Sequence, residues 1–229
     1  MKSHLLLDID GTLLRRSLEH WFVRYLIMSG KVGIQHLAAG FTHVMEWPPR
    51  SYRVKLFYLF NQPEDLVAEW IEQAWRSAIQ MHLFRGWSRT MEWLCQQNFE
   101  IILISGTPRP LAQPLMEYFG LQTAICAEPE ILQGRYSGRL LQPHPRGVWK
   151  KKYAIDWLQS HNHGLESALA IANDWPDRHL LSACQSMVVQ PRKRLRKLAH
   201  EKDWPLVVDP NQADNLIEAI QRTLNKPCK

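Results

Sequence analysis

Short apolar runs alternate with longer helical patterns along most of this chain of 229 residues. Leu5-Leu6-Leu7 forms the first run, and five further runs follow after about residue 86. We predict strands at residues 4–9, 100–104, 123–127, 168–172, 186–190 and 205–208, with helices between them. Such alternation is typical of a mostly parallel sheet that helices cover on both faces. Residues 131–141 are predicted to form a short hairpin instead.

Residues 15–85 interrupt this alternation with a helical pattern rich in aromatic side chains. One stripe, at the spacing of a helix face, comprises Leu18, Trp21, Phe22, Tyr25 and Leu26. A second stripe follows Pro63 and comprises Val67, Ile71, Ala74 and Ala78. Trp47-Pro48-Pro49 separates the two stripes. We therefore expect a core of residues 1–14 and 86–229, and a helical cap of residues 15–85 inserted into it.

The first apolar run ends in two aspartates, Asp8 and Asp10, followed by Gly11. A strand directs two such carboxylates to the same side, and a charge at the end of a buried strand is costly unless it binds or reacts. One carboxylate can attack an electrophile while the other transfers a proton. With a phosphorus electrophile, Asp8 forms an aspartyl-phosphate, and Asp10 protonates the leaving alkoxide and then deprotonates water. Because two carboxylates repel a phosphate dianion, the pair implies a hard divalent cation, Mg²⁺.

Asp8-Ile-Asp-Gly-Thr12 resembles the first motif of the haloacid dehalogenase (HAD) superfamily of phosphatases. Three more segments resemble its later motifs in the same order: Glu100-Ile-Ile-Leu-Ile-Ser-Gly-Thr107, Lys151 before a helix, and Ala170-Ile-Ala-Asn-Asp-Trp-Pro-Asp177. The resemblance is to the phosphoserine-phosphatase-like group, subfamily IB, and covers most of the chain outside residues 15–85. It implies a Rossmann-like α/β core, a cap inserted after the first strand, and hydrolysis of a phosphomonoester.

The second and third motifs imply the residues that hold phosphate. Ser105 and Gly106 stand between a strand and a helix, where a hydroxyl and backbone amides suit a phosphate oxygen. The family lysine, which neutralises the nucleophile and the transferred group, usually has apolar residues four and seven positions later. Lys151 meets this pattern with Ile155 and Leu158 and is our choice over Lys150.

The fourth motif departs from the usual Gly-Asp-Ser-x-x-Asp, whose first aspartate binds the metal. Aligned on Asp177, the chain has Asn173 at the position of that ligand and Asp174 at the serine. Asparagine can coordinate a cation through its carbonyl oxygen but adds no charge. Either Asn173 or Asp174 therefore completes a Mg²⁺ site with Asp8, Asp10 and Asp177, and we expect loss of Asp174 to be the more damaging.

Composition and charge bear on whether the protein binds nucleic acid, spans a membrane or contains disulfides. The net charge is +6, and residues 189–203 supply six basic and two acidic residues, a net +4. Leu195, Leu198 and Ala199 recur there at helical spacing, so we predict a packed helix with a basic face and no nucleic-acid binding. No apolar stretch reaches the roughly 20 residues of a membrane span. The four cysteines show neither metal nor disulfide spacing, and we expect a cytoplasmic protein with reduced thiols.

These observations predict a Mg²⁺-dependent phosphomonoesterase acting on a small phosphorylated metabolite. Three alternatives stay open: a phosphomutase, a non-catalytic binding protein that keeps the fold, and a lipid-phosphate phosphatase at the membrane surface. The last is motivated by the tryptophans and the positive charge. The motifs do not specify the substrate, because its selection depends on residues of the cap.

Overall fold

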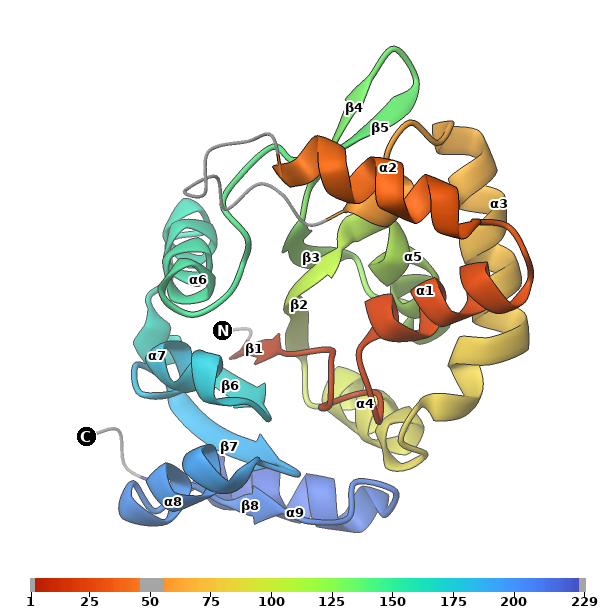
Figure 1. Cartoon of the computed structure of the whole chain (residues 1–229). Coiled ribbons are helices and arrows are strands. Elements are labelled where there is room, and N and C mark those ends of the chain that lie inside the picture. Colours follow the sequence, from red (N-terminus) through yellow and green to blue (C-terminus); the bar gives the residue numbers. More distant parts are fainter. Residues whose placement is uncertain (1–2, 46–55, 227–229) are drawn as a thin grey trace.

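Six parallel strands form the central sheet of the computed structural model, which describes residues 3–45 and 56–226 (Figure 1). In spatial order they are β3 (Thr123–Ala127), β2 (Phe99–Pro108), β1 (Ser3–Leu7), β6 (Ala168–Ala172), β7 (Gln185–Val189) and β8 (Leu206–Val207). All five neighbouring pairs run parallel. The predicted strands and the Rossmann-like α/β fold class are thus confirmed.

The order of the strands reverses at β1. From β1 the chain proceeds to β2 and β3 on one side, and it later passes to β6, β7 and β8 on the other side. In an open parallel sheet, ligands bind at the carboxyl ends of the strands where the order reverses. The carboxyl ends of β1 and β6 are therefore the place where this topology favours a site.

Alternate residues of β1 face two different layers of helices. Leu6 belongs to a core cluster with residues of α6 (Val148–Ser160), α7 (Arg178–Leu181) and α8 (Lys193–Glu201). Leu5 and Leu7 face the other layer, which includes α4 (Gly86–Gln96), α5 (Arg109–Phe119) and α9 (Ala213–Leu224). This two-sided burial explains why the strands read as continuous apolar runs.

The segment between β1 and α4 is helical. It contains α1 (Leu18–Met28), α2 (Ile34–Met45), η1 (Phe57–Leu59), α3 (Glu64–Ala74), the π-helical turn η2 (Trp75–Ile79) and η3 (Gln80–His82). Leu18, Phe22 and Leu26 of α1 are buried in the same cluster as Leu5 and Leu7. These helices therefore pack on a core that is continuous with one face of the sheet. Trp47-Pro48-Pro49 lies outside the described residues.

The second predicted stripe is correct only in part. Val67, Ile71 and Ala74 are buried on α3, as expected. The helix then widens into η2, and the π turn buries Ile79 in place of Ala78. A π turn shifts the following side chains around the helix axis relative to an α-helix, which a constant helical period does not anticipate.

The predicted hairpin and the predicted basic helix are both present in the structure. β4 (Pro129–Leu132) and β5 (Arg135–Leu140) form the expected antiparallel hairpin, and η4 (Leu165–Ser167) precedes β6. The basic helix α8 buries Leu195 and Ala199 against the sheet.

Three cysteines in the described part of the chain are free thiols, and Cys228 lies outside it. No helix within residues 3–45 or 56–226 is long and apolar enough to span a membrane.

Candidate active site

Asp8 stands at the carboxyl end of β1, directly at the point where the strand order reverses. Its backbone N–H donates to the carbonyl of Ile171 at 3.0 Å, which continues the pairing of β1 with β6. The Asp8 side chain is buried, and its Oδ2 accepts a hydrogen bond of 3.0 Å from Thr12 Oγ1. The Trp87 indole donates to the Thr12 carbonyl at 2.8 Å. The turn after β1 is thus fixed from the side of α4.

Gly11 is required by both conformation and space. Its φ is +81°, and a Cβ at this position would lie 1.9 Å from Nδ2 of Asn173. A residue with a side chain would be strained at this φ and would push the Asn173 amide away from the turn. The consequence is that the Asn173 side chain, which follows β6, lies directly against the turn that carries Asp8 and Asp10.

Asp10 is held between two elements. Its Oδ1 accepts from the backbone N–H of Leu18, the first residue of α1, at 2.9 Å. Its Oδ2 accepts from Thr107 Oγ1 at 3.0 Å. A carboxylate at the N-terminus of a helix is stabilised by the helix dipole and its free amides. The same contact ties the start of α1 to the candidate acid/base.

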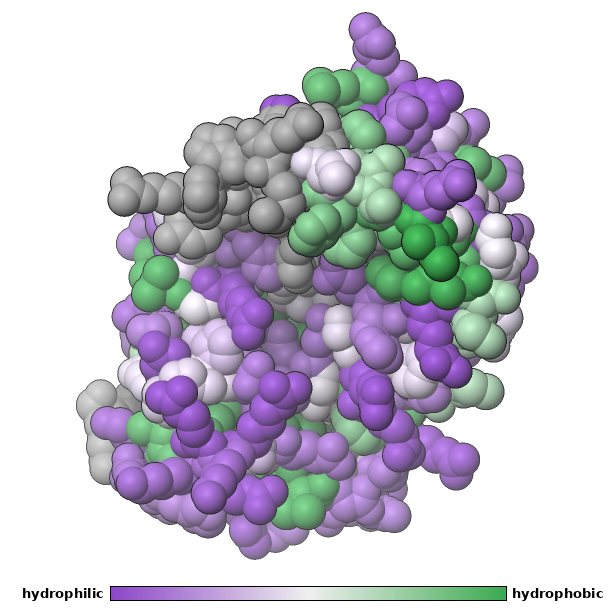
Figure 2. All heavy atoms as spheres, in the orientation of Figure 1, coloured by the Kyte–Doolittle hydropathy of each residue, from purple (hydrophilic) through white to green (hydrophobic). Residues whose placement is uncertain are grey.

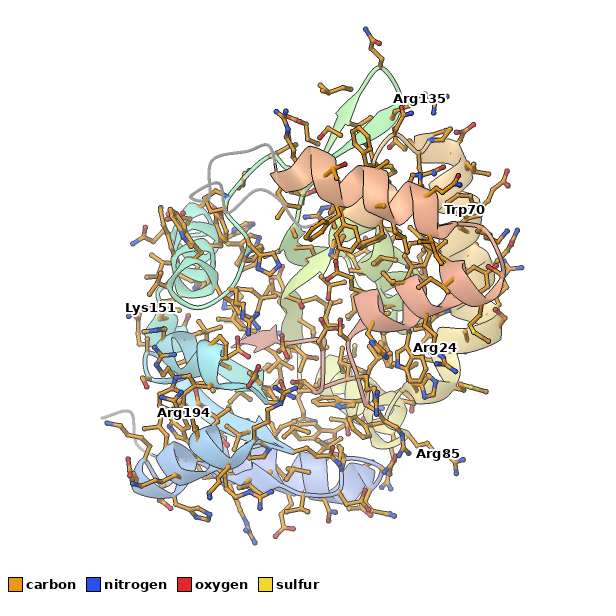
Figure 3. All side chains as sticks on the ribbon, in the orientation of Figure 1. Arg24, Trp70, Arg85, Arg135, Lys151 and Arg194 are labelled. Carbon is orange, nitrogen blue, oxygen red and sulfur yellow. The ribbon has the colours of Figure 1, made fainter. Side chains whose placement is uncertain are left out.

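Lys150, from the first turn of α6, is the lysine of this site. Its Nζ donates to Asp8 Oδ1 at 2.6 Å and lies 2.9 Å from Asp177 Oδ1, and its side chain is only 2% exposed. Lys151 is half-buried on α6 and does not line the cavity; in Figure 3 it lies at the outer edge of the molecule. The choice of Lys151 is therefore corrected to Lys150. The side of α6 that faces the sheet carries Ala154 and Leu158.

The buried charges perturb one another. Burial raises the pKa of the Asp8 carboxyl, against the lowering effect of Lys150, and the nearby Asp177 raises this pKa further. Burial alone lowers the pKa of Lys150, but the charges of Asp177 and Asp8 outweigh it and raise this pKa above its ordinary value. With all three groups ionised, the cluster carries a net charge of −1, and this negative charge favours the binding of a further cation.

Ser105 and Gly106 lie beside this cluster, at the carboxyl end of β2. Ser105 Oγ accepts from the backbone N–H of Thr107 at 3.2 Å and lies 3.1 Å from Thr107 Oγ1. A Cβ on Gly106 would lie 2.2 Å from Cε1 of His144. Gly106 thus lets the His144 ring approach the backbone of the predicted phosphate-binding turn.

The fourth motif is divided between two environments. Asp177 is buried and paired with Lys150. Asp174 Oδ1 accepts from the backbone N–H of Trp175 at 2.8 Å, where it caps η5 (Trp175–Asp177), and its Oδ2 lies 3.9 Å from both Arg146 and Arg192. The described residues contain no group of three or more His, Cys, Asp or Glu placed to hold a metal. A cation here needs other oxygen ligands, such as the Asn173 amide and the Asp10 carbonyl.

All of these groups open into one cavity of about 600 Å³. The structure brings together every predicted site residue except Lys151: Asp8, Asp10, Ser105, Gly106, Asn173, Asp174 and Asp177. The cavity is also lined by residues that sequence reasoning missed: Arg15, Arg16, Ser17, His20, His144, Arg146, Gln190 and Arg192. Figure 2 shows hydrophilic side chains around this hollowed part of the surface. Thr107 was part of the quoted second motif, so its hydroxyl was a signal available in the sequence.

Residues 5–182 match the family model of the haloacid dehalogenase-like hydrolases. The chain belongs to this family. The predicted resemblance to its phosphoserine-phosphatase-like group is also confirmed. Phosphoserine phosphatase SerB1 of Mycobacterium tuberculosis is 28% identical over 144 residues, which cover 62% of this chain and 43% of SerB1. The chain thus spans less than half the length of this curated relative.

Two solved structures share the HAD fold. A Bordetella pertussis Tohama I protein of unknown function aligns with a TM-score of 0.78 at 22% identity, covering 91% of this chain and 99% of its own. A phosphoserine phosphatase, solved as an analogue of its phospho-aspartyl intermediate, aligns with a TM-score of 0.64 at 14% identity, covering 95% and 98%. At these identities the likeness concerns the fold alone.

Proposed function

We propose that this HAD family member is a Mg²⁺-dependent phosphomonoesterase that acts on a small phosphorylated substrate through an aspartyl-phosphate on Asp8. The observation that carries the proposal is the cluster at the end of β1. Asp8 and Asp10 face one cavity at the point where the strand order reverses, with Lys150 2.6 Å from Asp8. The phosphoserine phosphatase solved as a phospho-aspartyl intermediate analogue has the same fold.

In the first half-reaction, a carboxylate oxygen of Asp8 attacks phosphorus as the bond from phosphorus to the leaving oxygen breaks. Asp10, half-buried at the start of α1, donates a proton to that leaving oxygen. In the second half-reaction, Asp10 takes a proton from water while the water oxygen attacks phosphorus. The bond from phosphorus to Asp8 then breaks, which releases inorganic phosphate and restores both carboxyl groups.

Lys150 and the carboxyl-terminal part of β2 position the phosphoryl group in this proposal. Lys150 carries a positive charge beside Asp8, which offsets the negative charges of the attacking carboxylate and of the phosphoryl group. Ser105 Oγ and the backbone at Gly106 line the same cavity and provide donors for phosphoryl oxygens. Arg146 and Arg192 line its open side and attract an anionic substrate.

The residues present fit a divalent cation. We assign its ligands to Asp8, the backbone carbonyl of Asp10 and the side chain of Asn173. Asn173 lies against Gly11, whereas the Asp174 carboxylate is already occupied by the cap of η5 and two arginines. These contacts favour the opposite of the expectation that Asp174 matters more. When bound, Mg²⁺ would supply the charge that offsets the repulsion between the carboxylates and a phosphate dianion.

We further propose that residues 15–85 act as the cap that selects the substrate. Four residues at the start of this segment, Arg15, Arg16, Ser17 and His20, line the cavity. The hydrogen bond from Leu18 to Asp10 fixes their position relative to the reacting groups.

The direct test is hydrolysis of an aryl phosphate by the purified protein with Mg²⁺ and with excess chelator. We expect phosphate release that requires Mg²⁺. Phosphate binding without release in either condition would favour a non-catalytic binding protein. With a sugar phosphate in place of the aryl phosphate, transfer of the phosphoryl group to a second hydroxyl would favour a phosphomutase.

A further inference from the structure

A second cavity, of about 570 Å³, lies along α1. Ser17 and His20 line both this cavity and the one that contains Asp8. The two cavities therefore adjoin at these two residues. Because Ser17 is the N-cap of α1 and Leu18 is bonded to Asp10, the second cavity starts beside the candidate acid/base.

The second cavity differs chemically from the first. Beyond Ser17 and His20 it is lined mostly by apolar side chains, Val23, Ile27 and Met28 of α1 and Phe57 and Tyr58 of η1, and also by Glu19 and Arg24. Ile27 is 50% exposed and Met28 is 73% exposed, which is unusual for large apolar side chains on a helix that packs on a core. Figure 2 shows hydrophobic surface gathered over the C-terminal end of α1 and along α2.

The direction of α1 relates the two cavities. The helix begins beside Asp10 at Leu18 and runs outward, so a group that follows it from Ser17 to Ile27 extends about 15 Å from the catalytic end. Charge is graded along this path. Arg15 and Arg16 line the catalytic cavity together with Lys150, whereas farther along the helix the lining is mostly apolar and the charges of Glu19 and Arg24 are of opposite sign. This sequence of a cationic end followed by an apolar end is complementary to an amphiphile with a phosphate head.

We propose that the substrate is a phosphomonoester with a single apolar chain, whose phosphate lies at Asp8 and whose chain occupies the cavity along α1. This inference rests on the proposed phosphatase function and names its substrate class. The occupant is the substrate's own chain rather than a membrane surface, because the apolar cavity shares its lining with the catalytic one.

The test measures kcat/KM for ethyl, butyl, hexyl and octyl phosphate, each below its micelle-forming concentration. A chain that enters the cavity gains up to about fourfold per buried methylene, so we expect octyl phosphate to exceed ethyl phosphate by at least about 100-fold. Equal values across the series would overturn the proposal.

Two matched variants locate the effect. Ile27 lines the cavity, whereas Ile34 on α2 is 86% exposed and does not. Ile27→Glu is expected to reduce the octyl-to-ethyl ratio to within about threefold of unity, because it replaces apolar lining by a second carboxylate in addition to that of Glu19, and this opposes an apolar chain. Ile34→Glu is expected to keep the wild-type ratio. An equal loss in both variants, accompanied by lost binding to anionic vesicles, would assign the effect to surface contact and overturn the proposal.

A binding measurement separates this inference from the proposed function. If no phosphate ester is hydrolysed, the phosphatase assignment fails, but calorimetric titration with the same four alkyl phosphates still decides the question. Affinity that rises with chain length in the wild type and in Ile34→Glu, but not in Ile27→Glu, supports the cavity along α1 as the site of the chain. Affinity independent of chain length contradicts it.

Discussion

Asp8 and Asp174 line the same cavity in opposite environments. Asp8 is 5% exposed and its two oxygens are bound by Thr12 and Lys150 at 3.0 and 2.6 Å. The Asp174 side chain is 29% exposed, and its arginine partners, themselves mostly exposed, lie 3.9 Å away. Contacts made in the buried part are little screened and costly to break, whereas those at the open side are weakened by water and salt. The comparison predicts that chemistry and folding depend on the buried side, and binding on the open side.

The largest expected effect is that of Asp8→Asn. An amide cannot act as the attacking carboxylate, so turnover should fall by about 10⁴-fold or more, as for removal of other nucleophiles. The measurement is steady-state phosphate release, with circular dichroism to confirm that the variant is folded. Wild-type turnover in a folded Asp8→Asn protein would remove the basis of the comparison.

Asp10→Asn sharpens the comparison, because Asp10 joins the buried strand end to α1. Loss of a general acid costs most when the leaving group is poor, and about 10²–10⁴-fold is typical. We expect that loss for alkyl phosphates and a clearly smaller one for aryl phosphates with good leaving groups. Equal losses on both classes, measured as kcat, would mean that Asp10 acts through the metal instead of through a proton.

Lys150→Met tests how much the buried ion pairs of Lys150 contribute to the free energy of unfolding. The variant leaves Asp8 and Asp177 buried without their cation, and removal of one partner of a buried pair costs about 3–5 kcal/mol. Lys151→Met, on the next position of the same helix, is the matched control and should change the free energy of unfolding by less than about 0.5 kcal/mol. Urea denaturation measures both, and similar values for the two variants would restore Lys151 as a candidate.

We also expect the unfolding free energy of Lys150→Met to depend on pH. Burial and Asp177 raise the pKa of Asp8, and the variant removes Lys150, the cation that lowers this pKa. The folded state then binds a proton more readily than the unfolded state, so the unfolding free energy of Lys150→Met should increase as the pH falls below neutral.

The choice between Lys150 and Lys151 illustrates what the sequence could and could not predict. Lys150 and Lys151 are neighbours on α6, and the apolar side chains at Ile155 and Leu158 favour Lys151 in the sequence. In the structure, the face toward the sheet is set by the small Ala154 together with Leu158, because a small residue lets the helix approach closely. Ile155 is half-buried at the side. Helical periodicity predicts that a face exists, but packing decides its angle.

The smallest expected effect concerns the boundary between the two environments. Asn173 lies against Gly11, and Asp174 faces the arginines. Asn173→Ala should therefore raise the Mg²⁺ concentration for half-maximal activity by about 10–100-fold, and Asp174→Ala by less. Mg²⁺ titrations of both variants decide this; a larger shift for Asp174→Ala would place the cation at the open side.

The fold was predictable because its strands are buried on both faces and therefore appear as short apolar runs separated by helices. Asp8 and Asp10, the proposed reacting groups, stand out in the sequence because charge directly follows such a run. The open side was not predictable, because His144 and Arg146 come from the loop between β5 and α6, Arg192 comes from the loop between β7 and α8, and only the fold brings them to one cavity. Their residue types are common on surfaces, and no spacing in the sequence relates them to Asp8.

The central claim is that Asp8 is the residue that accepts the phosphoryl group. The most direct measurement is acid quenching of the enzyme during turnover of a phosphomonoester, followed by mass spectrometry of its peptides. The account predicts phosphorylation of the peptide that contains Asp8, at that residue, and none in the Asp8→Asn variant. Turnover without any phosphorylated peptide, or a phosphoryl group on another residue that persists in Asp8→Asn, would contradict it.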